Sequence, residues 1–156
     1  MDIRRIENNE VMLLTDFLYE AIFQRDILHL APRTIIQEPS LWRYINNFGK
    51  EKDDHCFVAE VDDKIVGAVW VRCMDTLVPE FAISIYPQYR GKGIGTALMK
   101  KMLEYLQSKG YQKASLSVQK DNYALKLYRN LGFEIGDENE QEHIMVYDFN
   151  GCVNKE

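Results

Sequence analysis

The sequence predicts an α/β fold with a mixed, largely antiparallel central sheet and helices on both faces. Apolar residues alternate with period two in some segments and recur every three to four residues in others. In chain order these patterns predict a strand, a helical region, three strands, a helix, a strand, a helix and two strands. Strands that follow one another closely favour antiparallel pairing, whereas strand–helix–strand units favour parallel pairing, so one sheet should contain both.

The first half should contain the helical region and four of the strands. Short β-rich runs occupy residues 3–6, 56–61, 65–71 and 78–86. Helical spacing covers 11–23, and a second short helix is expected over 41–48, ending at Gly49. Asp62-Asp63 separates two of the strands and predicts a hairpin, while Pro87 stops the last one.

The second half alternates helices and strands. A helix is expected to follow a glycine cluster and to end at Gly110, and another carries apolar residues at i, i+3, i+4 and i+7 from Ala124 and ends at Gly132. Short strands are expected over 114–118, 133–135 and 144–149, with 138–142 as a polar turn. Length and the absence of a Gly-, Pro- or Ser-rich linker predict a single domain over 1–156.

Composition excludes several classes of protein. Lys and Arg number 19 against 24 Asp and Glu, and this acidic balance disfavours binding to nucleic acid. The three cysteines lack the paired spacing of a disulfide framework or a zinc site, so a reducing cytoplasm and no metal are expected. No segment approaches the length of a membrane span or has the apolar core of a signal peptide, so no membrane association is expected.

The most informative segment is a basic, glycine-rich turn between a strand and a helix. It runs Arg90-Gly91-Lys92-Gly93-Ile94-Gly95-Thr96. Glycines allow close approach of a ligand to the backbone, and the first N–H groups of a helix attract anions, so a phosphate site is predicted. A P-loop is excluded because Gly91-Lys92 is followed by glycine, and a dinucleotide fingerprint fails because Thr96 occupies its third glycine position.

The pattern that remains, Arg90-x-x-Gly93-x-Gly95 after a strand ending in Ile85-Tyr86-Pro87, resembles the acetyl-CoA pyrophosphate loop of the GNAT superfamily of N-acetyltransferases. A second stretch from Asn122 to Phe133, Asn-x-Ala-x-x-Leu-Tyr-x-x-Leu-Gly-Phe, resembles the second motif of the same family. The resemblance covers residues 56–149 and implies a GNAT-like fold. It implies a helical acceptor-side region over 1–50 and an acetyl-CoA-binding core over 78–133.

The same resemblance implies the residues that hold acetyl-CoA. The backbone of Ile83 and Ile85 is expected to pair with the pantetheine arm, and Tyr128 to lie beside its sulfur. Asn122 is expected to contact the cofactor, although its position is equally suited to starting a helix. The complete expected cofactor-binding set is Ile83, Ser84, Ile85, Arg90, Gly91, Lys92, Gly93, Ile94, Gly95, Thr96, Asn122 and Tyr128.

Acetyl transfer by direct attack on the thioester, without a covalent enzyme intermediate, requires a neutral amine. The resemblance makes Glu80 the candidate base, because the family often carries a Glu on this strand; it would act directly or through water, and a surface or ion-paired role is the alternative. Tyr128 is the candidate proton or hydrogen-bond donor to the leaving sulfur, with packing in the core as the alternative. The N–H of Ile85 is the candidate donor to the oxyanion.

The acceptor amine cannot be deduced from the sequence. Seven residues of the N-terminal region form an aromatic set that is expected to serve mostly in packing and partly in lining a pocket: Phe17, Tyr19, Phe23, His29, Trp42, Tyr44 and Phe48. A catalytically silent CoA-binding sensor or interaction module is the alternative to an enzyme. The resemblance also leads us to expect a homodimer.

Overall fold

The computed structural model describes residues 1–24 and 26–150, whose strands form one seven-stranded sheet in the order β1-β2-β3-β4-β5-β7-β6. The strands are β1 (Asp2–Arg5), β2 (His55–Val61), β3 (Lys64–Arg72), β4 (Glu80–Ile85), β5 (Lys113–Gln119), β6 (Glu134–Glu138) and β7 (Glu142–Asp148). Every neighbouring pair is antiparallel except β4 and β5, which are parallel. The predicted mixed, largely antiparallel sheet is confirmed.

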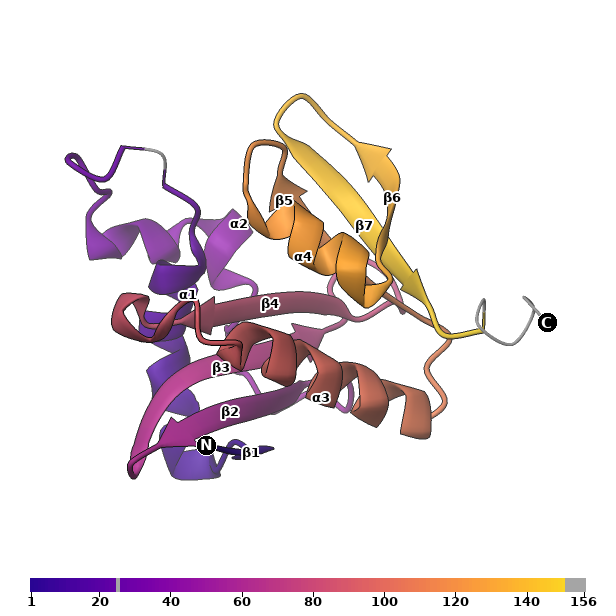
Figure 1. The fold of residues 1–156 in the computed structure, drawn as a ribbon, viewed down its shortest axis with the longest axis horizontal. Coiled ribbons are helices and arrows are strands. Elements are labelled where there is room, and N and C mark those ends of the chain that lie inside the picture. The colour runs from indigo at the N-terminus through magenta and orange to yellow at the C-terminus, as the bar shows by residue number, and fades with distance from the viewer. Residues whose placement is uncertain (25, 151–156) are drawn as a thin grey trace.

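Helices cover both faces of this sheet, as the sequence predicts. The helices α1 (Leu14–Ala21) and α2 (Pro39–Trp42) lie on one face, which we call the acceptor face. The helices α3 (Ile94–Ser108) and α4 (Ala124–Leu131) lie on the other, which we call the cofactor face (Figure 1). Each face therefore has its own apolar core.

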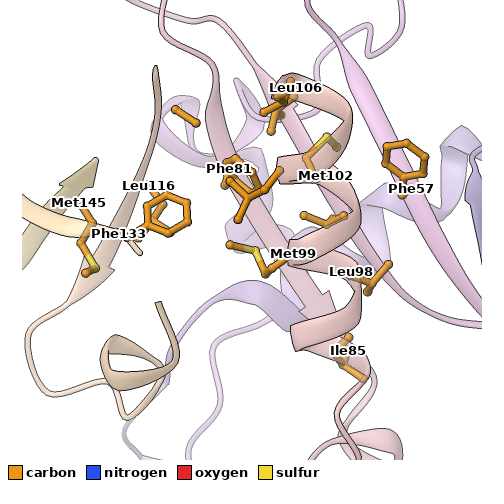
Figure 2. Packing of buried hydrophobic residues seen from close by; sticks show 14 of the residues in the cluster. Phe57, Phe81, Ile85, Leu98, Met99, Met102, Leu106, Leu116, Phe133 and Met145 are labelled. Carbon is orange, nitrogen blue, oxygen red and sulfur yellow. The ribbon is translucent and has the colours of Figure 1, made fainter. Parts of the chain in front are cut away.

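The larger core lies under α3. Leu98, Met99, Met102 and Leu106 form the buried stripe of this helix, in keeping with helical spacing (Figure 2). They pack with Phe57 and Phe81 of the central strands and with three residues beyond the β4–β5 junction: Leu116, Phe133 and Met145. Side chains on the cofactor face therefore join the strands β1 to β4 to the strands β5, β7 and β6.

The two N-terminal helices are shorter than their sequence patterns predict. Residues 8–13 form a 3-10 helix before α1, and α2 ends at Trp42, with turns continuing to Gly49. The physical reason for the second difference is competition for carbonyl groups. The carbonyls of Arg43, Tyr44 and Asn46 accept hydrogen bonds from side chains of β3, so they are drawn away from helical partners.

The hairpin between β2 and β3 is confirmed. Asp62 and Asp63 both have positive φ, 52° and 63°, the backbone of a type I′ turn that matches the twist of the flanking strands. The helices α3 and α4 also lie where the sequence predicts them, with Gly110 and Gly132 in the left-handed conformation after the helices. The last two strands extend into the predicted polar turn, because β6 continues to Glu138 and β7 begins at Glu142, so the turn is shorter than predicted. Within the described residues, no helix combines the length and apolar character needed to cross a bilayer.

The parallel strands β4 and β5 separate almost as soon as they meet. They share one register pair, Glu80 with Ser115, and the N–H of Ser115 donates to the carbonyl of Pro79 at 2.9 Å. Beyond that point the β5–β7–β6 part of the sheet turns away from the β1–β4 part (Figure 1). The chain thus builds a split in the middle of its own sheet.

Candidate active site

A cavity of about 210 Å³ lies at the split between β4 and β5. Its walls include residues of the cofactor face, among them Ile83, Met99 and Tyr128. They also include residues of the acceptor face, such as Leu18 and Tyr44. A cavity with walls from both faces allows a ligand bound on one face to contact a ligand bound on the other.

The glycine-rich turn lies at the N-terminus of α3. Gly91 and Gly93 have φ of 76° and 83°, and a Cβ on either would meet no protein atom within 4 Å. The first intrahelical hydrogen bond runs from Ala97 to the carbonyl of Gly93, so the N–H groups of Ile94, Gly95 and Thr96 precede the ladder. Open space beside N–H groups that precede the helical ladder is the geometry of a phosphate site.

The two basic side chains of this turn have different surroundings. Arg90 donates from Nε to the carbonyl of Ile85 at 2.8 Å and from Nη2 to the carbonyl of Glu20 at 3.2 Å. It therefore ties the turn to the end of β4 and to α1. The Lys92 ammonium lies 5.7 Å from the centroid of the Tyr89 ring and is exposed beside the turn.

The edge of β4 that faces the split presents backbone groups. The N–H of Tyr86 donates to Val66 on the β3 side, and the carbonyl of Pro79 accepts on the β5 side. Since backbone groups alternate in direction along a strand, Ile83 and Ile85 direct theirs toward the split, as Pro79 does. Ser84 is different, because its side chain is buried and its hydroxyl has no partner within the described part of the chain.

Asn122 is expected either to contact the cofactor or to start a helix, and its position suits both roles. Its Oδ1 accepts from the N–H of Ala124 at 2.9 Å and so starts α4, while the residue also lines the cavity. Tyr128, two turns further along α4, lines the same cavity and packs edge-on against Phe133 at 6.2 Å between ring centroids. Burial raises the pKa of Tyr128 to about 12.

Glu80 lies on the acceptor face, one layer behind the cavity wall. Its Oε2 accepts a hydrogen bond from the hydroxyl of Tyr44, and Tyr44, not Glu80, lines the cavity. Burial is the main cause that raises the pKa of Glu80, opposed by the Tyr44 hydrogen bond and by Arg43. The pKa of Tyr44 is also raised, by burial and then by the charge of Glu80.

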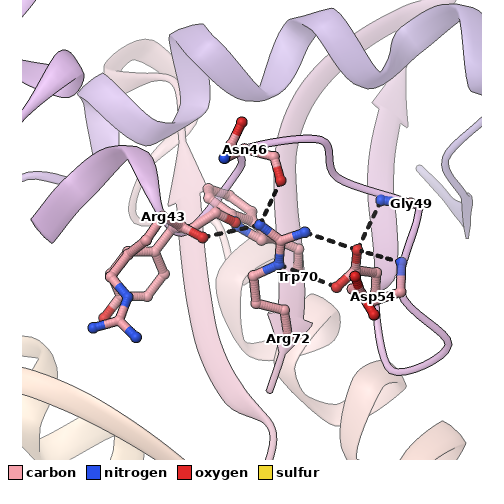
Figure 3. A network of polar contacts seen from close by, with 8 residues as sticks. Arg43, Asn46, Gly49, Asp54, Trp70 and Arg72 are labelled. Atoms are coloured by element: carbon pink, nitrogen blue, oxygen red, sulfur yellow. Dashed lines mark hydrogen bonds and ion pairs between the residues drawn. The ribbon is translucent and has the colours of Figure 1, made fainter. Parts of the chain in front are cut away.

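A buried ion pair fixes the segment that carries Tyr44 (Figure 3). Arg72 donates from Nε and Nη2 to the two carboxylate oxygens of Asp54, at 3.1 and 2.8 Å, and from Nη1 to the carbonyls of Arg43 and Asn46, both at 2.9 Å. The indole Nε1 of Trp70 donates to the carbonyl of Tyr44 at 3.2 Å. Hydrogen bonds to the carbonyl of Tyr44 and to that of the preceding residue, Arg43, thus hold the backbone at Tyr44 in place.

Glu142 is a cavity residue that the sequence did not single out. It pairs with Gln119 in the β5–β7 ladder, and both line the cavity. Glu142 is the only charged residue among the described residues that line it. Of the aromatic set named above, Phe23 and Tyr44 line the cavity, whereas Phe17 and Phe48 belong to the core of the acceptor face.

Comparison with known proteins identifies the family. A profile of the acetyltransferase (GNAT) family matches residues 22–133, a span that contains the glycine-rich turn, the split between β4 and β5, and α4. The chain belongs to the GNAT family.

A GNAT relative of known sequence is an uncharacterized N-acetyltransferase of Methanocaldococcus jannaschii. It is 37% identical over an alignment of 93 residues that covers 54% of this chain and 41% of that protein. The chain therefore matches about two fifths of the length of this curated relative.

Solved structures of GNAT proteins share the fold at low sequence identity. The PaiA N-acetyltransferase of Thermoplasma acidophilum, in complex with coenzyme A, has a TM-score of 0.73 at 18% identity and covers 94% of this chain and 98% of its own. A variant of the spermidine N-acetyltransferase of Vibrio cholerae has a TM-score of 0.71 at 19% identity, with 99% of both chains covered. A ribosomal-protein alanine N-acetyltransferase of Escherichia coli has a TM-score of 0.68 at 18% identity, with 95% and 93% covered.

Within the described residues, no group of three or more His, Cys, Asp or Glu side chains is placed to hold a metal ion.

Proposed function

We propose that this protein transfers an acetyl group from acetyl-CoA to a primary amine by direct attack, without a covalent enzyme intermediate. The cavity that runs through the split sheet carries this proposal, because it brings walls of both faces to one place. Family membership supports the same reaction class.

The residues present fit acetyl-CoA. Open space beside Gly91 and Gly93, together with the first N–H groups of α3, suits the pyrophosphate. The backbone of Ile83 and Ile85 suits the pantetheine arm, which would join the open edge of β4 as an added strand. When bound, acetyl-CoA supplies an activated thioester.

The candidate catalytic groups then have separate tasks. Glu80 receives a proton from the amine side, and the hydroxyl of Tyr128 donates a hydrogen bond on the sulfur side. The N–H of Ile85 is the candidate donor to the carbonyl oxygen. An alkylamine with a pKa near 10.4 is neutral about once in a few thousand molecules at pH 7, a cost of roughly 4–5 kcal/mol, so a route for its proton is needed.

The fold does not select the acceptor. The solved neighbours include proteins named for spermidine and for a ribosomal-protein alanine, which are different amines on a similar fold. A thiol-release assay with acetyl-CoA and a broad panel of amines tests the proposed function. Thiol release that depends on the amine supports an enzyme, whereas binding of acetyl-CoA with no turnover on any amine supports a silent CoA-binding module.

We also propose that the protein is a cytoplasmic homodimer. The proposal of a dimer rests on the family resemblance and that of the compartment on the cysteine pattern. Light scattering at micromolar concentration should give about twice 18.3 kDa, and a mass near 18.3 kDa would contradict the dimer.

A further inference from the structure

We propose that Tyr44, Glu80 and Glu142 form an acceptor subsite for a cationic alkylamine, in which the Tyr44 hydroxyl receives a proton from the ammonium group and passes its own proton to Glu80. The proposal rests on the proposed acetyl transfer. It adds a catalytic residue, Tyr44, and a chemical class for the acceptor.

The strand register places both carboxylates on the acceptor face. Glu80 pairs with Ser115, and Glu142 pairs with Gln119 two pleats further along β5, so the side chains of all four point to the same side of the sheet. Tyr44 reaches this face from the segment after α2 and donates its hydroxyl proton to Glu80. Glu142 lies near enough for its charge to act on both Tyr44 and Glu80.

Access decides which group meets the amine. Tyr44 lines the cavity and Glu80 does not, so an amine in the cavity meets Tyr44 before it meets Glu80. The phenol oxygen of Tyr44 gives its proton to Glu80 and keeps lone pairs to accept one from the ammonium. The carboxylate is thus one hydrogen bond behind the wall that the substrate touches.

The proton transfer balances without any further reactant. An ammonium N–H bond breaks as a bond forms between that proton and the Tyr44 oxygen, while the Tyr44 O–H bond breaks as its proton bonds to Oε2 of Glu80. The amine becomes neutral, Glu80 becomes a carboxylic acid, and Tyr44 is neutral before and after. A free tyrosinate is never needed, which matters because burial and the Glu80 charge oppose ionisation of Tyr44.

The charges around the subsite favour a cation. Glu142 is a carboxylate in the wall, Glu80 lies behind Tyr44, and Asp75 is a further acid whose charge acts on Glu80. Among the residues that the structure describes, Arg43 is the one cation with a resolved effect on Glu80, and it lies at the surface in an ion pair with Asp75 at 2.6 Å. An acceptor with a carboxylate near its amine would meet like charge, whereas a second ammonium would be attracted.

The position of Tyr44 is fixed by contacts that do not involve the ligand. Trp70 holds its carbonyl, and Arg72, paired with Asp54, holds the carbonyl of the preceding residue. A hydroxyl held in this way is oriented before the acceptor arrives, which is what an efficient proton transfer needs.

The first experiment compares amines that do and do not need to lose a proton. We expect Tyr44→Phe to reduce kcat on n-butylamine at pH 7 by roughly a hundredfold or more, the usual effect of a positioned acid–base group. Hydroxylamine is already neutral at pH 7, so its acetylation should fall much less, and the n-butylamine rate should recover as the pH rises. Tyr111→Phe is the matched control, because Tyr111 also donates to a carboxylate, that of Asp53 at 2.5 Å, but lies outside the cavity.

The outcomes separate the two proposals. No transfer by the unaltered protein to either amine would remove the proposed function. Transfer by the unaltered protein, with equal losses for Tyr44→Phe on both amines at every pH, would assign Tyr44 a structural role and overturn the relay. A double variant with Glu80→Gln should be no slower than the slower single variant, because both residues serve one step; multiplied losses would also overturn it.

The second experiment tests the charge preference with acceptors of one chain length. We expect kcat/KM to fall in the order 1,4-diaminobutane, n-butylamine, 4-aminobutanoate. Glu142→Gln should reduce the ratio of kcat/KM for 1,4-diaminobutane to kcat/KM for 4-aminobutanoate by roughly fivefold or more, the size expected for the loss of one charge contact. An unchanged ratio, or a preference for the amino acid, would overturn the cationic class.

Discussion

The hydroxyl of Tyr128 lies in an environment that opposes ionisation, because burial raises its pKa to about 12. A free thiol has a pKa near 8.5, so complete proton transfer from this phenol to a thiolate would be uphill by roughly 5 kcal/mol. A hydrogen bond from a neutral phenol to a developing thiolate has no such cost. We therefore infer that Tyr128 acts as a hydrogen-bond donor to the departing sulfur.

Replacement of Tyr128 by Phe tests that role. The ring that packs against Phe133 is kept and only the hydroxyl is lost. We expect kcat to fall roughly tenfold to a hundredfold, which corresponds to one hydrogen bond to a charged group, while affinity for CoA stays the same. Tyr123→Phe, at an 80% exposed position just before α4, is the control for steady-state kinetics. Equal kinetics for the two variants would mean that Tyr128 serves only in packing of the core.

Glu80 gives a pH prediction with a definite sign. Burial is the main cause that raises its pKa in the folded protein above the ordinary value of 4.5; the Tyr44 hydrogen bond and Arg43 oppose this rise, and the charges of Glu142 and Asp75 add to it. The protonated carboxyl thus favours folding below that ordinary value, and this contribution is lost as the pH rises through the folded-state pKa. Because glutamine resembles the protonated form, Glu80→Gln should raise the melting temperature at pH 8.

The same comparison should change with pH. The gain in melting temperature for Glu80→Gln should shrink as the pH falls through the folded-state pKa of Glu80 and should be lost below about 4.5, where the folded and unfolded forms of the unaltered protein are both protonated. Calorimetry of both proteins from pH 4 to pH 8 measures this difference. A variant that is less stable at pH 8 would mean that the charged carboxylate stabilises the fold through Tyr44.

At the scale of secondary-structure elements, local patterns predict most of what the structure contains. The hairpin at Asp62-Asp63, the buried stripe of α3 and the end of α4 at Gly132 each depend on neighbours within a few residues. The N-terminal helices are less predictable, because side chains of Trp70 and Arg72 capture carbonyls of a segment far away in the chain.

In the candidate site, too, some residues belong to short local motifs and others come together only in the folded protein. The glycine-rich turn and Tyr128 are predicted as site residues from contiguous motifs. Tyr44 and Glu80 are 36 positions apart, and only the folded sheet brings them together with Glu142. The sequence places Tyr44 in an aromatic set that is expected mostly to pack and partly to line a pocket, but assigns it no catalytic role, because an acceptor wall built from several strands leaves no short motif.

The helix α3 offers a test of the phosphate site with a matched control. Gly93 and Gly110, at its two ends, have φ of 83° and 85°, and neither has a protein atom within 4 Å of a new Cβ. Alanine at either position therefore has a similar backbone cost, about 1 kcal/mol. We expect Gly93→Ala to weaken CoA binding in calorimetry by roughly tenfold or more, because its methyl group adds bulk beside the N–H groups, and Gly110→Ala to leave it unchanged. Equal affinities would place the pyrophosphate elsewhere.

On the scale of the whole molecule, the sheet is two parts joined mainly by side chains. The backbone ladder between β4 and β5 has a single register pair. On the cofactor face, Phe81 of β4 lies edge-on to Phe133, with 5.6 Å between ring centroids, and both belong to the core under α3. At the split, β4 and β5 therefore leave backbone hydrogen-bonding groups unused while their side chains remain packed. A ligand can add to β4 as a strand without unfolding the protein.

Hydrogen exchange should show that entry directly. The N–H groups of Ile83 and Ile85 point toward the split beyond the single register pair, and those of Ile94, Gly95 and Thr96 precede the α3 ladder. We expect saturating CoA to slow exchange in the peptides that carry these two segments more than in β1, which lies at the far edge of the sheet. A ligand that binds only the folded state also slows exchange that requires global unfolding, so β1 measures that general effect. Gly93→Ala at the same CoA concentration should lose much of the local protection. Uniform slowing across all strands would mean that CoA stabilises the fold without occupying the split, and the added-strand geometry would then be wrong.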